Sequence, residues 1–122
     1  MTQITKNTYD LEERTQRFGE RIIDFCRSLP VTPVTRRIID QLTGSGTSIG
    51  ANYMEANGAS SKRDFRNKIH ITRKEAQETK HWLRMVATAI PERKEEAREL
   101  WQEAHELTLI FQAISVKVRT KA

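Results

Sequence analysis

Seven residues between Arg63 and Arg84 follow one another at steps of three and four, which places their side chains on one side of an α-helix. Five carry a permanent positive charge; the full set is Arg63, Arg66, His70, Arg73, Gln77, Lys80 and Arg84. At a rise of about 1.5 Å per residue this cationic line would extend ~30 Å, or about nine base-pair steps. The line therefore predicts a surface that binds the phosphate backbone of RNA or DNA. It contains no aromatic residue, so base stacking has no obvious agent.

The positive charge of the chain is concentrated in the same segment. Residues 62–90 hold eight basic and three acidic residues, a surplus of five that equals the whole-chain net charge of +5. Two alternatives to nucleic-acid binding remain open. In the first, the line is an ordinary solvated helix face. In the second, it forms salt bridges with carboxylates of residues 10–29 or 91–122, in the same or a neighbouring subunit.

A second candidate site is the glycine-rich stretch from Gly44 through Gly46 to Gly50. A phosphate-binding loop fits it poorly, because the third glycine comes one residue too late for G-x-G-x-x-G and no Gly-Lys-Ser/Thr follows. The helical apolar spacing instead runs through the stretch, from Leu42 to Ile49. We expect a helix whose small residues let a neighbour approach closely, with a local break near Gly44–Gly46 as the alternative.

Polar residues follow the same segment at helical spacing. Ser48, Asn52 and Glu55 share one helix face, and Glu78 and Thr79 lie near the apolar seam of the next predicted helix. These five residues predict a polar network that fixes the register of the two helices. The alternative is a ligand or catalytic site centred on Ser48, Asn52 and Glu55.

Other catalytic arrangements are missing from the sequence. His70, His81 and His105 are not at metal-ligand spacing, and Cys26 has no partner cysteine or positioned base. We therefore expect no cofactor, no metal, no small-molecule substrate and no enzymatic activity.

The elements that must position these residues are four amphipathic helices. Apolar residues recur at helical spacing in four segments. Pro30 and Pro33 lie between the first and second segments, and Pro91 lies between the third and fourth. Ser61, three residues before Asp64, is the expected cap of the third helix. The short connections predict an all-α, up-down-up-down four-helix bundle, with another packing of the helices as the alternative. The expected segments are a flexible N-terminal segment 1–9, helices 10–29, 33–58, 62–90 and 91–118 within one domain 10–118, and a basic C-terminal tail 119–122.

Bulk properties set the cellular context. The 122 residues suit one domain, and 30% charged against 7% aromatic residues favours helices over a β-sandwich. No signal peptide and no membrane-spanning run is evident, and the single cysteine cannot form an internal disulfide. A cytoplasmic protein without a membrane partner is the expectation.

Several apolar residues fall outside the predicted seams. Leu109 and Val116 are one heptad apart with Ala113 between them, and Ile71 lies outside the stripe of its own helix. Such a group is more typical of a subunit interface than single exposed residues are, so we expect a homo-oligomer.

The sequence also resembles a known family, the small four-helix-bundle proteins first known as 23S rRNA intervening-sequence proteins. The resemblance rests on a Thr-Ser-Ile-x-x-Asn-x-x-Glu segment, a Ser-Lys-x-x-Phe helix start and a Glu-Thr-x-x-x-Leu segment. Here these are Thr47, Ser48, Ile49, Asn52 and Glu55; Ser61, Lys62 and Phe65; and Glu78, Thr79 and Leu83.

The resemblance implies a helical bundle that assembles as a ring-like homopentamer. Relatives within rRNA-gene insertions, or acting as accessory proteins of diversity-generating retroelements, imply nucleic-acid binding. The family's biochemical role is largely undefined. One departure is Gly44-Ser45-Gly46, where relatives often have Arg-Ser-Ala, so any role of that arginine does not transfer to this chain.

Overall fold

The computed structural model describes the backbone of residues 3–121 and the side chains of residues 11–119. In this part of the chain all regular structure is helical, with no strand. The elements are α1 (Gln3–Arg27), α2 (Thr35–Asn57), α3 (Lys62–Ala89), the short 3-10 helix η1 (Pro91–Arg93) and α4 (Lys94–Lys121).

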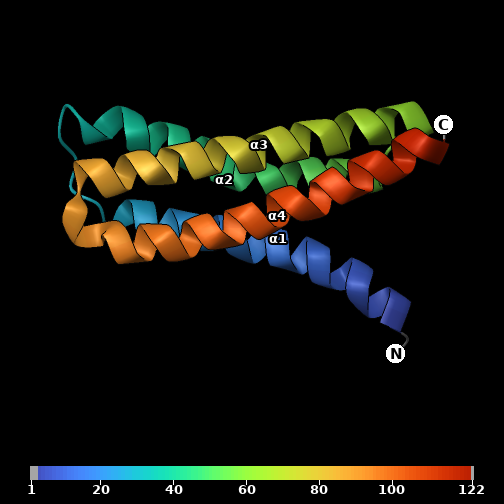
Figure 1. The fold of residues 1–122 in the computed structure, drawn as a ribbon, viewed down its shortest axis with the longest axis horizontal. Helices are drawn as coiled ribbons and strands as arrows, with labels where there is room; N and C mark the ends of the chain where they lie inside the picture. Colours follow the sequence, from blue (N-terminus) through green and yellow to red (C-terminus); the bar gives the residue numbers. More distant parts are fainter. Residues whose placement is uncertain (1–2, 122) are drawn as a thin grey trace.

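Consecutive helices run antiparallel, and α3 packs along both α2 and α4 (Figure 1). α1 packs along α2 but meets α4 over only a short stretch, and its N-terminal part diverges from the other helices. The prediction of an all-α chain with four helices is therefore confirmed. The seam between α1 and α4 is the weakest contact between neighbouring helices.

Several predicted helix bounds differ from the structure: α1 ends at Arg27, α2 begins at Thr35, and α4 begins at Lys94, after η1. The differences at the two ends of the chain are larger. α1 begins at Gln3, so residues 3–9 are helical rather than a separate flexible segment, because no proline or glycine interrupts them. α4 continues to Lys121 for the same reason, so residues 119–121 of the expected tail belong to the helix. Residues 1–2 and 122 lie outside the described part of the chain.

Local side-chain hydrogen bonds lie in the turn before α2 and at the start of α3. The Thr32 hydroxyl accepts from the Thr35 N–H at 3.1 Å, and the Thr35 hydroxyl accepts from the Thr32 N–H at 2.8 Å. At the next helix the Ser61 hydroxyl accepts from the Asp64 N–H at 3.0 Å. Each cap satisfies backbone donors that have no partner within the helix.

The core consists of most of the predicted apolar residues, buried where the helices face one another; Val34, before the start of α2, is exposed instead. Its largest fully buried apolar side chains are Phe18, Ile22, Leu42, Ile49, Ile69, Leu83, Val86, Leu107 and Phe111. Tyr53 of α2 and Phe111 of α4 meet with ring centroids 5.3 Å apart, which joins the two helices that flank α3.

α2 is continuous through Gly44–Gly46, so the alternative of a local break is wrong. A Cβ at Gly46 would lie 2.8 Å from Cγ2 of the buried Ile22 on α1, and one at Gly50 would lie 3.3 Å from the Thr15 carbonyl oxygen. A Cβ at Gly44 would meet nothing within 4 Å. Two of the glycines therefore serve the close packing of α2 against α1, and Gly44 does not.

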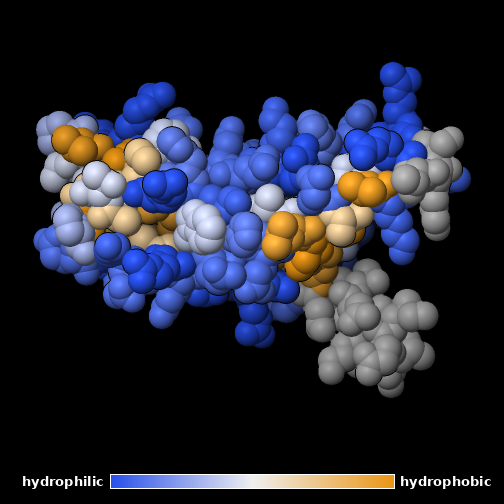
Figure 2. All heavy atoms as spheres, in the orientation of Figure 1, coloured by the Kyte–Doolittle hydropathy of each residue, from blue (hydrophilic) through white to orange (hydrophobic). Residues whose placement is uncertain are grey.

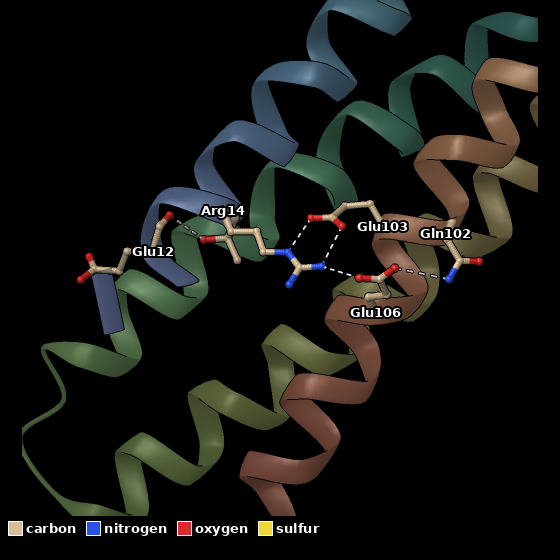
Figure 3. Close-up of polar contacts among 6 residues, drawn as sticks. Glu12, Arg14, Gln102, Glu103 and Glu106 are labelled. Carbon is tan, nitrogen blue, oxygen red and sulfur yellow. Dashed lines mark hydrogen bonds and ion pairs between the residues drawn. The ribbon is translucent and has the colours of Figure 1, made fainter. Parts of the chain in front are cut away.

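An arginine of α1 bridges α1 and α4, which otherwise share only a short contact (Figure 3). The Arg14 guanidinium donates to both Glu103 carboxylate oxygens, at 2.7 and 2.8 Å, and to Glu106 at 2.8 Å. The Arg14 side chain is 34% exposed and that of Glu103 is 19% exposed. A two-point, partly buried pair of this kind is stronger than an ordinary surface salt bridge. Hydrogen bonds from Arg14 lower the pKa of Glu106.

We expect Arg14→Ala to lower the free energy of unfolding by about 1–2 kcal/mol at neutral pH, because it strands the partly buried Glu103 carboxylate. The hydrogen bond from Arg14 lowers the pKa of Glu106, so this contact stabilises the protein above the ordinary carboxyl pKa and loses that effect as the pH falls. The difference between wild type and variant should therefore shrink from about pH 5 to about pH 3. Urea denaturation at each pH measures this.

Arg17→Ala is the matched control, since among the described side chains Arg17 pairs only with Glu13 of its own helix, at 3.2 Å, and both side chains are well exposed. It should change the unfolding free energy by less than about 0.5 kcal/mol at every pH. Equal losses in the two variants would show that the Arg14 contact contributes nothing specific.

Candidate nucleic-acid interface

The cationic line lies on the side of α3 that faces α4. Lys80 marks this side, because its ammonium lies 3.1 Å from Nδ1 of His105 on α4. The opposite side faces α2, where Lys68 donates to Glu55 at 2.6 Å. Arg63, His70 and Arg84 are exposed, whereas Arg66, Arg73 and Lys80 are half-buried. The line thus follows the edge of α3 that lies next to α4.

None of the five permanent cations of the line has a carboxylate oxygen within 4 Å among the side chains of residues 11–119. Arg73 Nη2 lies 3.2 Å from His70 Nδ1, and its Nε is buried without a hydrogen-bond partner. Among the side chains of residues 11–119, the alternative of neutralisation by salt bridges within one chain therefore finds no support. It stays open for a neighbouring subunit.

The carboxylates that could have neutralised α3 are engaged elsewhere. Glu103 and Glu106 of α4 bind Arg14 of α1. Glu96 accepts from Arg93 at 2.6 Å, and the hydrogen bond from Arg93 lowers the pKa of Glu96. These three carboxylates of α4 consequently stabilise other contacts and do not pair with the cationic line.

Sequence reasoning missed an aromatic residue beside the line. The Trp101 ring of α4 lies 5.2 Å below the Lys80 ammonium and stacks on His105, with centroids 5.0 Å apart and planes 14° apart. A signal existed: Lys80 and Trp101 lie equally far from the corner at Ile90 and Pro91, and such residues meet in an antiparallel helix pair. The line has an aromatic neighbour, supplied by another helix.

The structure does not join the five predicted polar residues into one network. Ser48 donates to the Gly44 carbonyl at 2.7 Å, and Asn52 donates to the Ser48 carbonyl at 2.9 Å, so both bonds stay within α2. Thr79 donates to Ser45 at 3.0 Å, in a buried bond between α3 and α2. The serine of α2 that bonds to α3 is therefore Ser45, whereas the sequence predicted Ser48.

The two carboxylates of the predicted network are separate from that bond. Glu55 is exposed and pairs with Lys68, while Glu78 is exposed beside Glu75. Burial first, and then the neighbouring Glu78 carboxyl, raises the pKa of Glu75. The arrangement brings no nucleophile and base together, and within residues 11–119 no three His, Cys, Asp or Glu residues cluster as a metal site.

The predicted interface residues form one strip and one separate residue. Leu109 and Val116 are 55% and 38% exposed and follow the outer face of α4 together with exposed Ala113. Figure 2 shows apolar side chains gathered over the C-terminal half of α4. Ile71 is 39% exposed but follows Lys68 by one turn, on the α2 side of α3. It does not extend the strip.

No helix in the described part of the chain combines the length and apolar character needed to cross a membrane. Residues 7–113 match the family model described as 23S rRNA-intervening sequence protein. The search of curated proteins gives no match.

A solved structure is also similar. It is the crystal structure of a protein of unknown function from the S23 ribosomal protein family of Bacteroides thetaiotaomicron. It has a TM-score of 0.75 and 30% identity, covering 85% of this chain and 96% of that chain. Together with the four-helix fold and the family motifs on α2 and α3, the match over residues 7–113 shows that this chain belongs to the 23S rRNA-intervening sequence protein family.

Proposed function

We propose that this protein is a non-enzymatic, cytoplasmic homo-oligomer that binds the phosphate backbone of RNA or DNA through the cationic line of α3. One observation carries the proposal: five cations share one side of a helix, and no carboxylate of the described side chains neutralises them. Cations held side by side along one helix repel one another, and the phosphates of a polyanion offset that repulsion. Binding also releases counterions condensed on the polyanion, which favours the complex. Binding of this kind tolerates sequence, because phosphates carry no base identity.

The exposed strip Leu109, Ala113 and Val116 supports assembly. Resemblance to the family adds the expectation of five subunits. A ring would repeat the cationic line once per subunit and so increase its affinity for a long polyanion.

The same strip favours a second candidate function, a structural homo-oligomer or protein adaptor with no nucleic-acid role. In that case the line meets carboxylates of a partner protein. The two functions differ in how binding to a polyanion responds to salt.

A salt titration of the wild-type protein tests the proposal. Its affinity for a labelled mixed-sequence DNA duplex and for the matching RNA duplex is measured by fluorescence anisotropy at several salt concentrations. If all five cations of one chain contact phosphates, the log-log slope on DNA should be about −4.5, so affinity should fall about 500-fold between about 50 and 200 mM salt. Absence of binding at about 50 mM salt would overturn the proposal and favour the adaptor.

A further inference from the structure

A basic pocket lies between the C-terminal part of α3 and the first turns of α4. Its volume is about 490 Å³, within the range of small-molecule sites in proteins. The charged side chains that line it are Arg84, Lys94 and Arg98, and no acidic residue lines it. Apolar carbons of Ala87 and Ala97, together with the Trp101 ring, make up much of the remaining wall. The pocket therefore combines an aromatic surface with three cations.

The contacts of Trp101 indicate which side of its ring faces this pocket. His105, one turn later on α4, stacks on the ring, and the Lys80 ammonium lies against the ring and 3.1 Å from His105. Ala97 and Arg98, one turn earlier, line the pocket. His105 therefore contacts the ring from the direction of the end of α4, whereas Ala97 and Arg98 place the pocket toward the start of α4.

Arg84 connects the pocket to the cationic line. It is the last member of the line on α3 and also a wall of the pocket. A strand whose phosphates follow the line would reach the pocket with its next nucleotide. Arg98 has one carboxylate nearby, Glu95 at 3.7 Å, and both side chains are more than 60% exposed, so solvent screens that pair strongly.

We propose that this pocket accepts one unpaired base of a single-stranded nucleic acid, stacked on Trp101, with the adjoining phosphates on Arg84, Lys94 and Arg98. The proposal rests on the proposed function and deepens it, because it makes single strands the preferred ligand. A paired base cannot enter, since both of its faces are covered by neighbouring base pairs. Stacking on an aromatic side chain contributes about 5- to 150-fold in affinity.

Tryptophan fluorescence tests the pocket directly, because the chain has two tryptophans. In a Trp82→Phe variant all indole emission comes from Trp101. An oligouridine single strand should quench this emission at saturation, and a duplex with the same number of phosphates should not. Uridine monophosphate alone serves as a third ligand: quenching by it at similar concentrations would overturn the single-strand assignment in favour of a free nucleotide site.

Affinity measurements on substituted proteins give a second readout. Trp101→Leu should weaken single-strand binding about 5- to 150-fold and leave duplex binding within about 2-fold. Trp82→Leu is the matched control and should change neither; circular dichroism confirms that both variants fold. If both nucleic acids bind but Trp101 emission and the Trp101→Leu affinity are unchanged, the pocket proposal fails and the phosphate-binding function stands. If neither binds at low salt, both fail.

Discussion

Reversing three charges of the cationic line, as in Arg66→Glu/Arg73→Glu/Lys80→Glu, should reduce duplex affinity at least 100-fold at about 50 mM salt. The three residues lie at the centre of the line, and no carboxylate of the described side chains pairs with them. Each substitution removes one phosphate contact and adds one like-charge repulsion. The log-log salt slope should fall from about −4.5 to about −1.8, because two of the five contacts remain.

A variant of equal charge separates this local effect from the loss of net charge. Arg21→Glu/Arg36→Glu/Arg37→Glu changes exposed cations of α1 and α2 by the same total amount. None of these three forms a salt bridge within the described side chains. Affinity should fall less than about 10-fold in this control, with the slope nearly unchanged.

The oligomeric mass of both variants is measured by light scattering, since a changed subunit number would alter affinity by itself. If the α1 and α2 control loses as much affinity as the α3 variant at unchanged mass, binding depends on overall charge. The line would then not be the binding surface.

The second large effect concerns the packing of α2 on α1. Gly46→Val should lower the free energy of unfolding by about 3 kcal/mol or more. A Cβ at this position would lie 2.8 and 2.9 Å from the two γ carbons of Ile22, closer than real Cβ contacts, and valine adds two further carbons. Ile22 is fully buried and β-branched, so its side chain cannot rotate away within a helix. Urea denaturation followed by circular dichroism measures the loss.

Gly44→Val is the matched control, two residues away on the same helix. A Cβ there meets nothing within 4 Å, and valine has a better helix propensity than glycine. This variant should be as stable as wild type or slightly more stable. Ile22→Ala should partly rescue Gly46→Val, so that the double variant loses less stability than the sum of the single ones. Additive losses would locate the strain elsewhere.

Local sequence determined the secondary structure of this protein. Helical spacing of apolar residues, prolines between the repeats and the Thr32 and Ser61 caps all act within about four residues, so they can be read along the chain. The cationic line is also a property of one helix, which is why its members could be named without a structure. Helix ends without a proline or cap, as at Gln3 and Lys121, could not be read in this way.

Tertiary structure decided which faces meet. Ser45 and Ser48 differ by three residues, or about 60° around the helix, and only the rotation of α2 against α3 selects Ser45 as the partner of Thr79. Packing of α4 against α3 brought Trp101 to the cationic line, and packing of α1 against α4 assigned Glu103 and Glu106 to Arg14. Helix rotation is set by the fit of many side chains at once, and this fit has no local signal in the sequence.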